Sequence, residues 1–336
     1  MRLLSRRVRP AAPRSTAPAP APAPAPIDLP AHLLRRLEFK VLRRLDGFLF
    51  GDYRGLFYGP SLDLAEVREY QPGDEVRRID WNVTARSGRL HVRQYREERE
   101  LTAWLVVDLS SSMNFGTRRV LKRDLAREFA GLASLVVTRH GDKIGAMTFG
   151  SASDASAMLA PRSGRAQALA VLNLLSGQGV SGRALPSARG GTDSKRSELD
   201  AALSAVERTL RRRSLVFVVS DFLELPPQGG EGWTGALGRL AQRHDVVAVR
   251  ISDPAERELP SVGGLRLRDP ESGAEQWIDT SDPRVRAAHA RLVGERDRAL
   301  KAALRAAQVD LLELDTQRDT VQPLLRFAAS RRGRRT

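Results

Sequence analysis

A chain of 336 residues is long enough to bury one large hydrophobic core or two smaller ones. It contains no cysteine, which excludes disulfides, thiolate nucleophiles and thiolate metal sites. Its formal net charge of +15 favours acidic partners, but much of the excess lies at the two ends and no nucleic-acid-binding motif accompanies it. No apolar run approaches the roughly 20 residues of a membrane-spanning helix. We therefore expect a soluble, cytoplasmic protein without a membrane span, whose main function is not nucleic-acid binding.

Residues 1–26 form a basic, Ala- and Pro-rich segment without any acidic residue. The alternation of Ala and Pro from Ala17 to Pro26 is typical of an extended spacer. Arg6, Arg7 and Arg9 interrupt any apolar core, which argues against a signal peptide. We expect a disordered tail here.

An amphipathic helix is predicted for residues 28–45, with Asp28 as its cap and Gly47 as its stop. Apolar residues recur on one face at helical spacing, and arginines occupy the other face. The apolar residues are Leu34, Leu37, Val41 and Leu45. This stripe indicates a packing face, and we expect the segment 27–100 to pack on a main domain at 101–331.

Charged and aromatic residues are concentrated between residues 59 and 81, around a turn signalled by Pro72-Gly73-Asp74. The candidate partner-binding residues of this stretch are Arg68, Glu69, Tyr70, Asp74, Arg77, Arg78, Asp80 and Trp81. One interpretation is a structural ion-pair network. The other is an interaction surface, because Arg, Tyr and Trp are enriched in binding hot spots.

A short apolar run from Trp104 to Val107 predicts a strand that ends on Asp108, and hydroxyls follow at Ser110 and Ser112. In an open α/β sheet, ligands bind at the carboxyl ends of the strands. A carboxylate and two hydroxyls at that place suit Mg²⁺ or Mn²⁺, with Ca²⁺ as a further candidate, rather than zinc. The alternative is a strand end followed by a polar turn.

Helix and strand signals alternate along the rest of the chain. Helices are predicted at 118–140, 165–175, 197–212, 233–242, 283–308 and 321–330. Strands are predicted at 143–149, 157–159, 215–219, 246–251 and 309–314, and a hairpin insertion from 265–267 and 275–278. The alternation predicts an α/β fold with a doubly wound, mostly parallel sheet.

Several of these stretches together resemble one bacterial family, the domain-of-unknown-function family 58. They are the motif from Arg68 to Trp81, the strand that ends in Asp-x-Ser-x-Ser-Met, Gly141–Phe149, Val218–Phe222 and Asp253–Glu256. The resemblance covers roughly residues 51–331. It implies a von Willebrand factor A-like, Rossmann-type domain, preceded here by an N-terminal helix and an irregular extension.

The resemblance also implies a divalent cation held by three loops. Asp108, Ser110 and Ser112 match the first loop. Asp221 matches the last loop, because the apolar run 215–219 delivers it to the same edge of the sheet.

The middle ligand is ambiguous between two hydroxyls. Gly190-Gly191-Thr192 resembles the family's Gly-Gly-Thr, whereas the residues after Ser197 have the register of the helix that should follow the ligand. Ser197 is favoured over Thr192. Either residue could instead be a helix N-cap.

These features predict a non-enzymatic, cation-dependent protein-interaction module. A cation held largely by neutral hydroxyls keeps positive charge, which suits an acidic side chain of a partner. Family members are typically encoded beside MoxR-type AAA+ ATPases, so the resemblance implies such an ATPase as partner in assembly or chaperone work. This chain has no G-x-x-x-x-G-K-[ST] motif of its own.

Two other classes of function compete with this prediction. One is a metal-dependent phosphatase or other hydrolase with Asp108 as nucleophile. Ser110 stands where haloacid-dehalogenase-type phosphatases need a second Asp as general acid. The other is a basic nucleic-acid-binding protein, whose binding would weaken steeply with salt.

Overall fold

The computed structural model describes residues 30–44, 66–74, 76, 79–94, 101–150, 157–177, 183–184, 197–224, 232–269 and 273–333. Within these residues a seven-stranded sheet has the strand order β11-β8-β7-β3-β4-β5-β6. Its parallel strands are β3 (Thr102–Asp108), β4 (Lys143–Phe149), β7 (Leu215–Ser220), β8 (Asp245–Ser252) and β11 (Asp310–Asp315). The antiparallel edge consists of β5 (Ala157–Arg162) and β6 (Arg183–Ala184).

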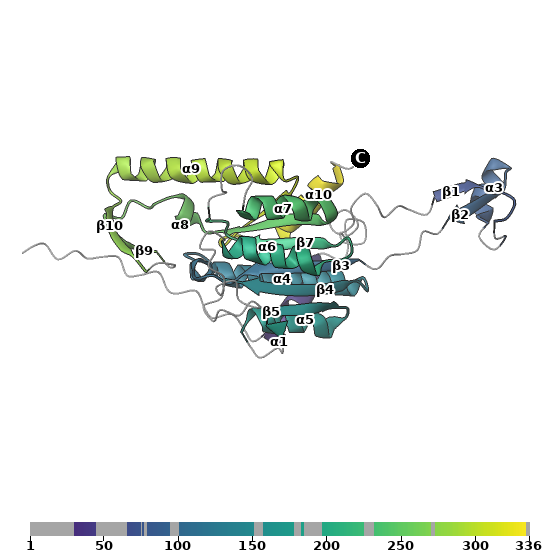
Figure 1. Ribbon diagram of the computed structural model, residues 1–336, viewed down its shortest axis with the longest axis horizontal. Coiled ribbons are helices and arrows are strands. Elements are labelled where there is room, and N and C mark those ends of the chain that lie inside the picture. Colours follow the sequence, from purple (N-terminus) through teal and green to yellow (C-terminus); the bar gives the residue numbers. More distant parts are fainter. Residues whose placement is uncertain are drawn as a thin grey trace, which may run out of the picture.

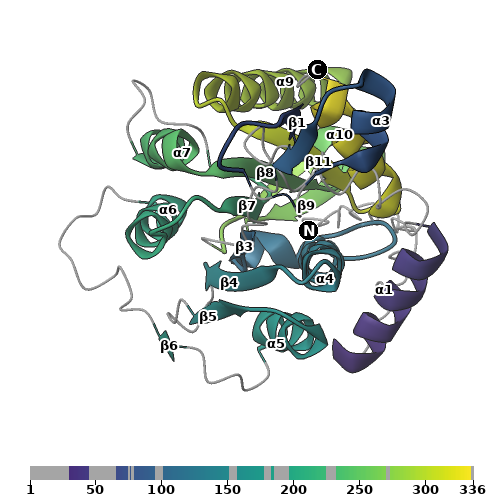
Figure 2. The same cartoon turned by 90° about the vertical axis from the view of Figure 1, so that its right-hand side faces the viewer.

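Helices cover both faces of this sheet (Figure 2). One face packs against α4 (Lys122–Arg139), α5 (Arg165–Leu175) and α10 (Val321–Gly333). The other packs against α6 (Glu198–Thr209), α7 (Gly232–Arg243) and α9 (Pro283–Ala306). Along β3, Leu105 and Val107 contact the first set of helices, and Trp104 and Val106 the second. Burial on both faces explains why the central strands are continuous apolar runs.

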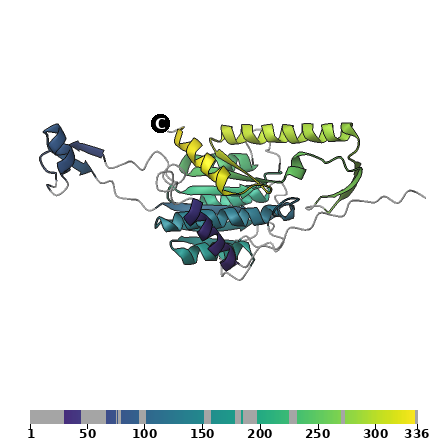
Figure 3. The ribbon, with the colours of Figure 1, turned by 180° about the vertical axis from the view of Figure 1, so that it is seen from behind.

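The N-terminal helix α1 (Pro30–Arg44) packs on α4 and α5 and belongs to the folded body (Figure 3). Its buried residues Leu33, Leu34 and Leu37 form a small cluster with residues of both helices. Gly131 in α4 allows the close approach, because a Cβ there would lie 2.6 Å from Cδ1 of Leu37.

Two smaller units lie outside the main sheet (Figure 1). Strands β1 (Glu66–Glu69) and β2 (His91–Gln94) pair antiparallel and enclose α3 (Trp81–Ser87). Of the described elements between residues 30 and 94, α1 contacts α4 and α5, and the unit of β1, α3 and β2 forms no strand pairing with the main sheet. The packing of the whole segment 27–100 on the main domain stays a prediction. The second unit is a hairpin of β9 (Gly264–Arg268) and β10 (Glu275–Asp279) beside one end of α9, after the short helix α8 (Pro254–Arg257).

The predicted elements are confirmed over most of the main domain, including the hairpin. Helix α4 begins later than predicted, at Lys122, because the backbone of Leu121 is extended. The elements β1, β2, α3, α8 and the two-residue β6 were not predicted. The described part of the chain holds no helix that is both long and apolar enough to cross a membrane.

Substitution of Leu34 by alanine should destabilise the main domain. Leu34 is fully buried between α1 and its neighbours, and removal of such a side chain costs about 2–5 kcal/mol. Arg35→Ala on the exposed side of the same helix is the matched control and should change stability by about 0.5 kcal/mol or less. Urea denaturation measures both. Equal, small effects would mean that α1 does not contribute to the stability of this domain.

Candidate functional site

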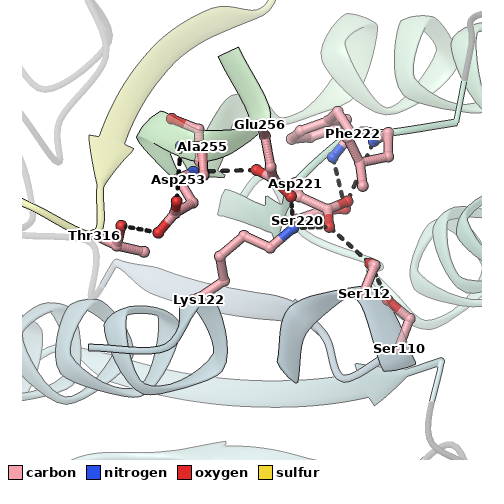
Figure 4. Close-up of polar contacts among 12 residues, drawn as sticks. Ser110, Ser112, Lys122, Ser220, Asp221, Phe222, Asp253, Ala255, Glu256 and Thr316 are labelled. Carbon is pink, nitrogen blue, oxygen red and sulfur yellow. Dashed lines mark hydrogen bonds and ion pairs between the residues drawn. The ribbon is translucent and has the colours of Figure 1, made fainter. Parts of the chain in front are cut away.

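Polar side chains from several loops meet at the carboxyl ends of the parallel strands (Figure 4). The loop after β3 includes the one-turn helix η2 (Ser111–Asn114) and carries Ser110 and Ser112. The loop after β7 carries Asp221, and the turn after β8 carries Asp253. Because the strands are parallel and adjacent, the sheet itself brings these loops to one edge.

Asp108, the last residue of β3, is buried and held by hydrogen bonds from Ser110 and Ser220. The backbone N–H of Ser110 donates to its Oδ1 (2.8 Å), and the hydroxyl of Ser220 at the end of β7 donates to its Oδ2 (2.6 Å). Gly150, which follows β4 with a φ of 75°, lies against this carboxylate. A Cβ at Gly150 would lie 2.9 Å from Oδ1 of Asp108 and 2.8 Å from the Ser110 nitrogen, so the loop needs glycine there.

Asp221 is linked to the first loop through hydroxyl groups. The hydroxyl of Ser112 donates to Asp221 Oδ2 (2.7 Å), and the hydroxyls of Ser110 and Ser112 are 3.1 Å apart. The next residue, Phe222, has a φ of 50°, a conformation that is rare for a bulky residue. Packing of its ring near Trp233 and an N–H bond to the Ser220 hydroxyl (3.1 Å) hold this turn in place.

Asp108 is buried beside a second carboxylate, that of Asp221. Burial raises the pKa of Asp108 to about 6, and the neighbouring charge of Asp221 adds to the increase. The hydrogen bonds from Ser220 and Ser110 act in the opposite direction but are too weak to offset it. Ionised Asp108 is therefore incompletely compensated by the protein around it.

Lys122 supplies a buried positive charge beside Asp221. It is the first residue of α4, and its Nζ donates to Asp221 Oδ2 (2.7 Å) and to Glu256 Oε1 (2.5 Å). Burial alone would lower the pKa of this ammonium, but the two carboxylates outweigh burial and raise it. Lys122 therefore remains charged although its side chain is fully inaccessible.

Asp253 ties the same edge together on the side of β8 and β11. Its carboxylate accepts hydrogen bonds from the N–H (2.8 Å) and hydroxyl (2.6 Å) of Thr117, the hydroxyl of Thr316 (2.5 Å) and the N–H of Ala255 (2.9 Å). Burial opposes ionisation, yet these four bonds outweigh it and lower the pKa of Asp253. Asp253 also forms a capping box with Glu256, which positions the Glu256 carboxylate for Lys122.

The structure brings four of the six predicted metal ligands together: Asp108, Ser110, Ser112 and Asp221. Ser197 caps α6, where its Oγ accepts from the N–H of Asp200 (3.1 Å) and also bonds the Glu224 carboxylate. Thr192 lies outside the described residues. The choice between Ser197 and Thr192 as the third-loop ligand stays a prediction.

The four oxygen-bearing side chains include only two carboxylates. No cluster of three or more His, Cys, Asp or Glu residues that could hold a metal is found here or elsewhere in the described part of the chain. Hydroxyl and carboxylate oxygens are hard ligands, so the chemistry of the set is compatible with Mg²⁺ or Mn²⁺.

The predicted partner-binding residues have mixed roles. Arg68 forms a bidentate ion pair with Asp74 (2.6 and 2.7 Å), and Asp80 caps α3 by accepting from the N–H groups of Asn82 and Val83. These contacts agree with a structural role for the three residues, and their contact with a partner stays a prediction.

The remaining partner-binding candidates that the structure describes are partly or largely exposed to solvent. Glu69 makes an exposed ion pair with Arg89, Tyr70 is half-buried, and Trp81 is 65% exposed. Arg77 and Arg78 lie outside the described residues.

Sequence reasoning missed Lys122, Glu256 and Ser220 as members of this edge. A signal for Lys122 existed, since it falls three, four and seven residues before Leu125, Ala126 and Phe129 on the buried face of α4. A lysine in such a stripe indicates a buried partner carboxylate. Ser220 carried no signal beyond its place at the end of a strand.

The fold and site define a class of α/β protein with a hydroxyl- and carboxylate-lined edge at the ends of its parallel strands. The family described as "Protein of unknown function DUF58" matches residues 66–299, and the chain belongs to this family. Uncharacterized proteins of Mycobacterium bovis and Mycobacterium tuberculosis are 39% identical over 302 residues, which is 90% of this chain and 90% of each relative. The conserved hypothetical protein BatB from Bacteroides thetaiotaomicron aligns with a TM-score of 0.40 and 13% identity, over 69% of this chain and 99% of that chain.

Substitution of Asp108 by asparagine should change stability in a pH-dependent way when a chelator is present. The pKa of Asp108 in the folded protein, about 6, lies above the ordinary value of 3.8. The raised pKa therefore adds to the free energy of unfolding of the wild type below pH 4, and this contribution is lost as the pH rises through about 6. The difference between Asp108→Asn and wild type should therefore shift in favour of the variant by up to about 3 kcal/mol between pH 4 and 7.

Urea denaturation across this pH range measures the effect. The control is Asp279→Asn, because hydrogen bonds from Ser281 lower the pKa of Asp279 and its variant should show a small shift of the opposite sign. A difference between Asp108→Asn and wild type that does not vary with pH would contradict the raised pKa.

Proposed function

We propose that this protein is a non-enzymatic interaction module, with a von Willebrand factor A-like domain of Rossmann type, that binds a partner through a divalent cation. The observation that carries the proposal is the convergence of Asp108, Ser110, Ser112 and Asp221 at one edge of the sheet. These residues would hold Mg²⁺ or Mn²⁺. When bound, the cation supplies a Lewis-acidic contact for a carboxylate of the partner.

The electrostatics of the site support a cation. Asp108 has a raised pKa because it is buried next to a second carboxylate, and a divalent cation between such groups relieves their repulsion. The neutral hydroxyls of Ser110 and Ser112 add oxygen ligands without adding negative charge. A cation held by two carboxylates and neutral hydroxyls keeps open coordination positions, and an acidic side chain of the partner can occupy one of them.

A MoxR-type AAA+ ATPase is the partner that we propose, on the strength of the family resemblance. The unit formed by β1, α3 and β2 offers a second contact surface. Its ion pair between Arg68 and Asp74 holds the turn, and the capped helix α3 presents Trp81 to solvent. Trp and Arg side chains are enriched among the hot spots of protein interfaces.

Mg²⁺ or Mn²⁺ should stabilise the wild type against thermal or urea denaturation. At a hundred times the dissociation constant, ligand linkage gives about 2.7 kcal/mol. Asp108→Ala should abolish this response, because it removes the carboxylate that is bonded to Ser110 and interacts with the charge of Asp221. Glu295→Ala, which removes an exposed carboxylate on α9, is the control and should keep the full response. A wild type whose stability is unchanged at millimolar metal would count against a cation site in the free protein.

Binding to the ATPase should depend on both surfaces. Asp108→Ala should remove the metal-linked part of the affinity, and Trp81→Ala should weaken binding by roughly thirtyfold, the effect of losing a hot spot of about 2 kcal/mol. Trp277→Ala is the matched control, because Trp277 is equally exposed but lies on the β9–β10 hairpin. Calorimetry with and without chelator measures these affinities. Unchanged affinity in a folded Asp108→Ala protein, and in the presence of chelator, would reject the metal-contact mechanism.

A further inference from the structure

Lys122 places a fixed positive charge on one of the two carboxylates of the proposed cation site. Its Nζ lies 2.7 Å from Asp221 Oδ2, the same oxygen that accepts the hydroxyl of Ser112. The ammonium also bonds Glu256 Oε1 at 2.5 Å, and the ring of Phe115 lies 6.0 Å away. Figure 4 shows the lysine reaching between the two carboxylates from α4.

The stability of the fold does not by itself explain this buried ion pair. A buried ion pair usually stabilises a protein no better than well-packed apolar side chains of similar size. Lys122 lies on the apolar face of α4, close to Leu125 and Ala126, where methionine would fit the pattern. Since fold stability alone does not call for a charge here, the lysine points to a role in the electrostatics of Asp221.

The charges of the two proposed carboxylate ligands, and of Glu256 and Lys122 beside them, define that role. Asp108, Asp221 and Glu256 carry three formal negative charges when ionised, and Lys122 compensates one of them. The two that remain match one divalent cation. Any cation that binds Asp221 must share this carboxylate with the ammonium, and like charges at close range inside a protein repel strongly.

We propose that Lys122 is an internal counter-ion that competes with the divalent cation for Asp221 and keeps the cation affinity of the isolated protein low. This inference rests on the proposed function, because it concerns the same site. It has a consequence for regulation: a cation bound weakly by the protein alone is retained when an acidic side chain of the partner completes its coordination. Cation and partner then bind cooperatively, each raising the affinity for the other.

The test is the affinity of the full chain for Mn²⁺ alone, measured from the electron paramagnetic resonance signal of the free ion. Lys122→Met removes the charge while keeping an unbranched side chain of similar length, and it should bind Mn²⁺ at least tenfold more tightly than the wild type. Lys301→Met is the matched control. Lys301 is also paired with a carboxylate, Glu313 at 3.5 Å, but lies on α9, and its loss should leave the Mn²⁺ affinity unchanged.

A double variant keeps the test valid if Lys122→Met alone fails to fold with Glu256 unpaired. Lys122→Met with Glu256→Gln removes one positive and one negative charge, so the net charge of the site equals that of the wild type. It should still bind Mn²⁺ more tightly, because the ammonium contacts Asp221 directly whereas Glu256 is bonded to Asp221 only through the ammonium.

The outcomes separate this inference from the proposed function. Tight Mn²⁺ binding by the lysine variants, lost again when Asp108→Ala is added, supports both. Measurable Mn²⁺ binding by the wild type that neither lysine variant strengthens would overturn the role of Lys122 and leave the cation site standing. Binding by none of the folded proteins would reject the cation site, and the inference with it.

Discussion

The constraint that shapes this molecule is the burial of carboxylates at the ends of its central strands. A buried carboxylate needs a compensating charge or several hydrogen-bond donors, because desolvation otherwise makes it costly. The protein meets this need differently at each strand. Asp253 after β8 receives four hydrogen bonds, and Asp221 after β7 receives the ammonium of Lys122. Asp108 at the end of β3 receives hydrogen bonds from Ser110 and Ser220 that do not offset its burial. The loops at this edge of the sheet supply the groups that compensate these three carboxylates.

The remainder of the fold positions those loops. Parallel pairing of β3 with β7 puts Val107 opposite Val219, so Asp108 and Ser220 follow side by side and can bond. Helix α4 begins directly after the first loop, which lets Lys122 reach back to Asp221. Asp253 then joins the loop before α4 to the end of β11 through Thr117 and Thr316. The apolar layers on both faces of the sheet hold this frame in register.

Sequence patterns predict the parts of the structure that follow from local periodicity. A buried parallel sheet covered by helices is predicted by the continuous apolar runs of β3 and β7 and by the apolar stripe of α4. The ends of these two strands then predict that Asp108 and Asp221 lie at the same edge of the sheet. Patterns fail where a side chain depends on a distant partner. Lys122 is separated from Asp221 by 99 residues and from Glu256 by 134, so its place in the stripe of α4 indicates a buried partner carboxylate but does not identify which one. The capping role of Ser197 was predictable as an alternative, since a serine before a helix suits both a cap and a ligand.

Asp253 and Asp108 differ in how fully the protein compensates their negative charge. Both are buried at the end of a parallel strand, and burial acts on both in the same direction. At Asp253 the hydrogen bonds outweigh burial and the pKa falls, so the ionised group is already satisfied and has no need of a ligand. At Asp108 the hydrogen bonds do not offset burial, and the charge of the neighbouring carboxylate disfavours the ionised form further. An ionised carboxylate that its own protein compensates incompletely is a candidate ligand for an external charge. This is the physical basis of our proposal that a cation binds at Asp108 rather than elsewhere along this edge.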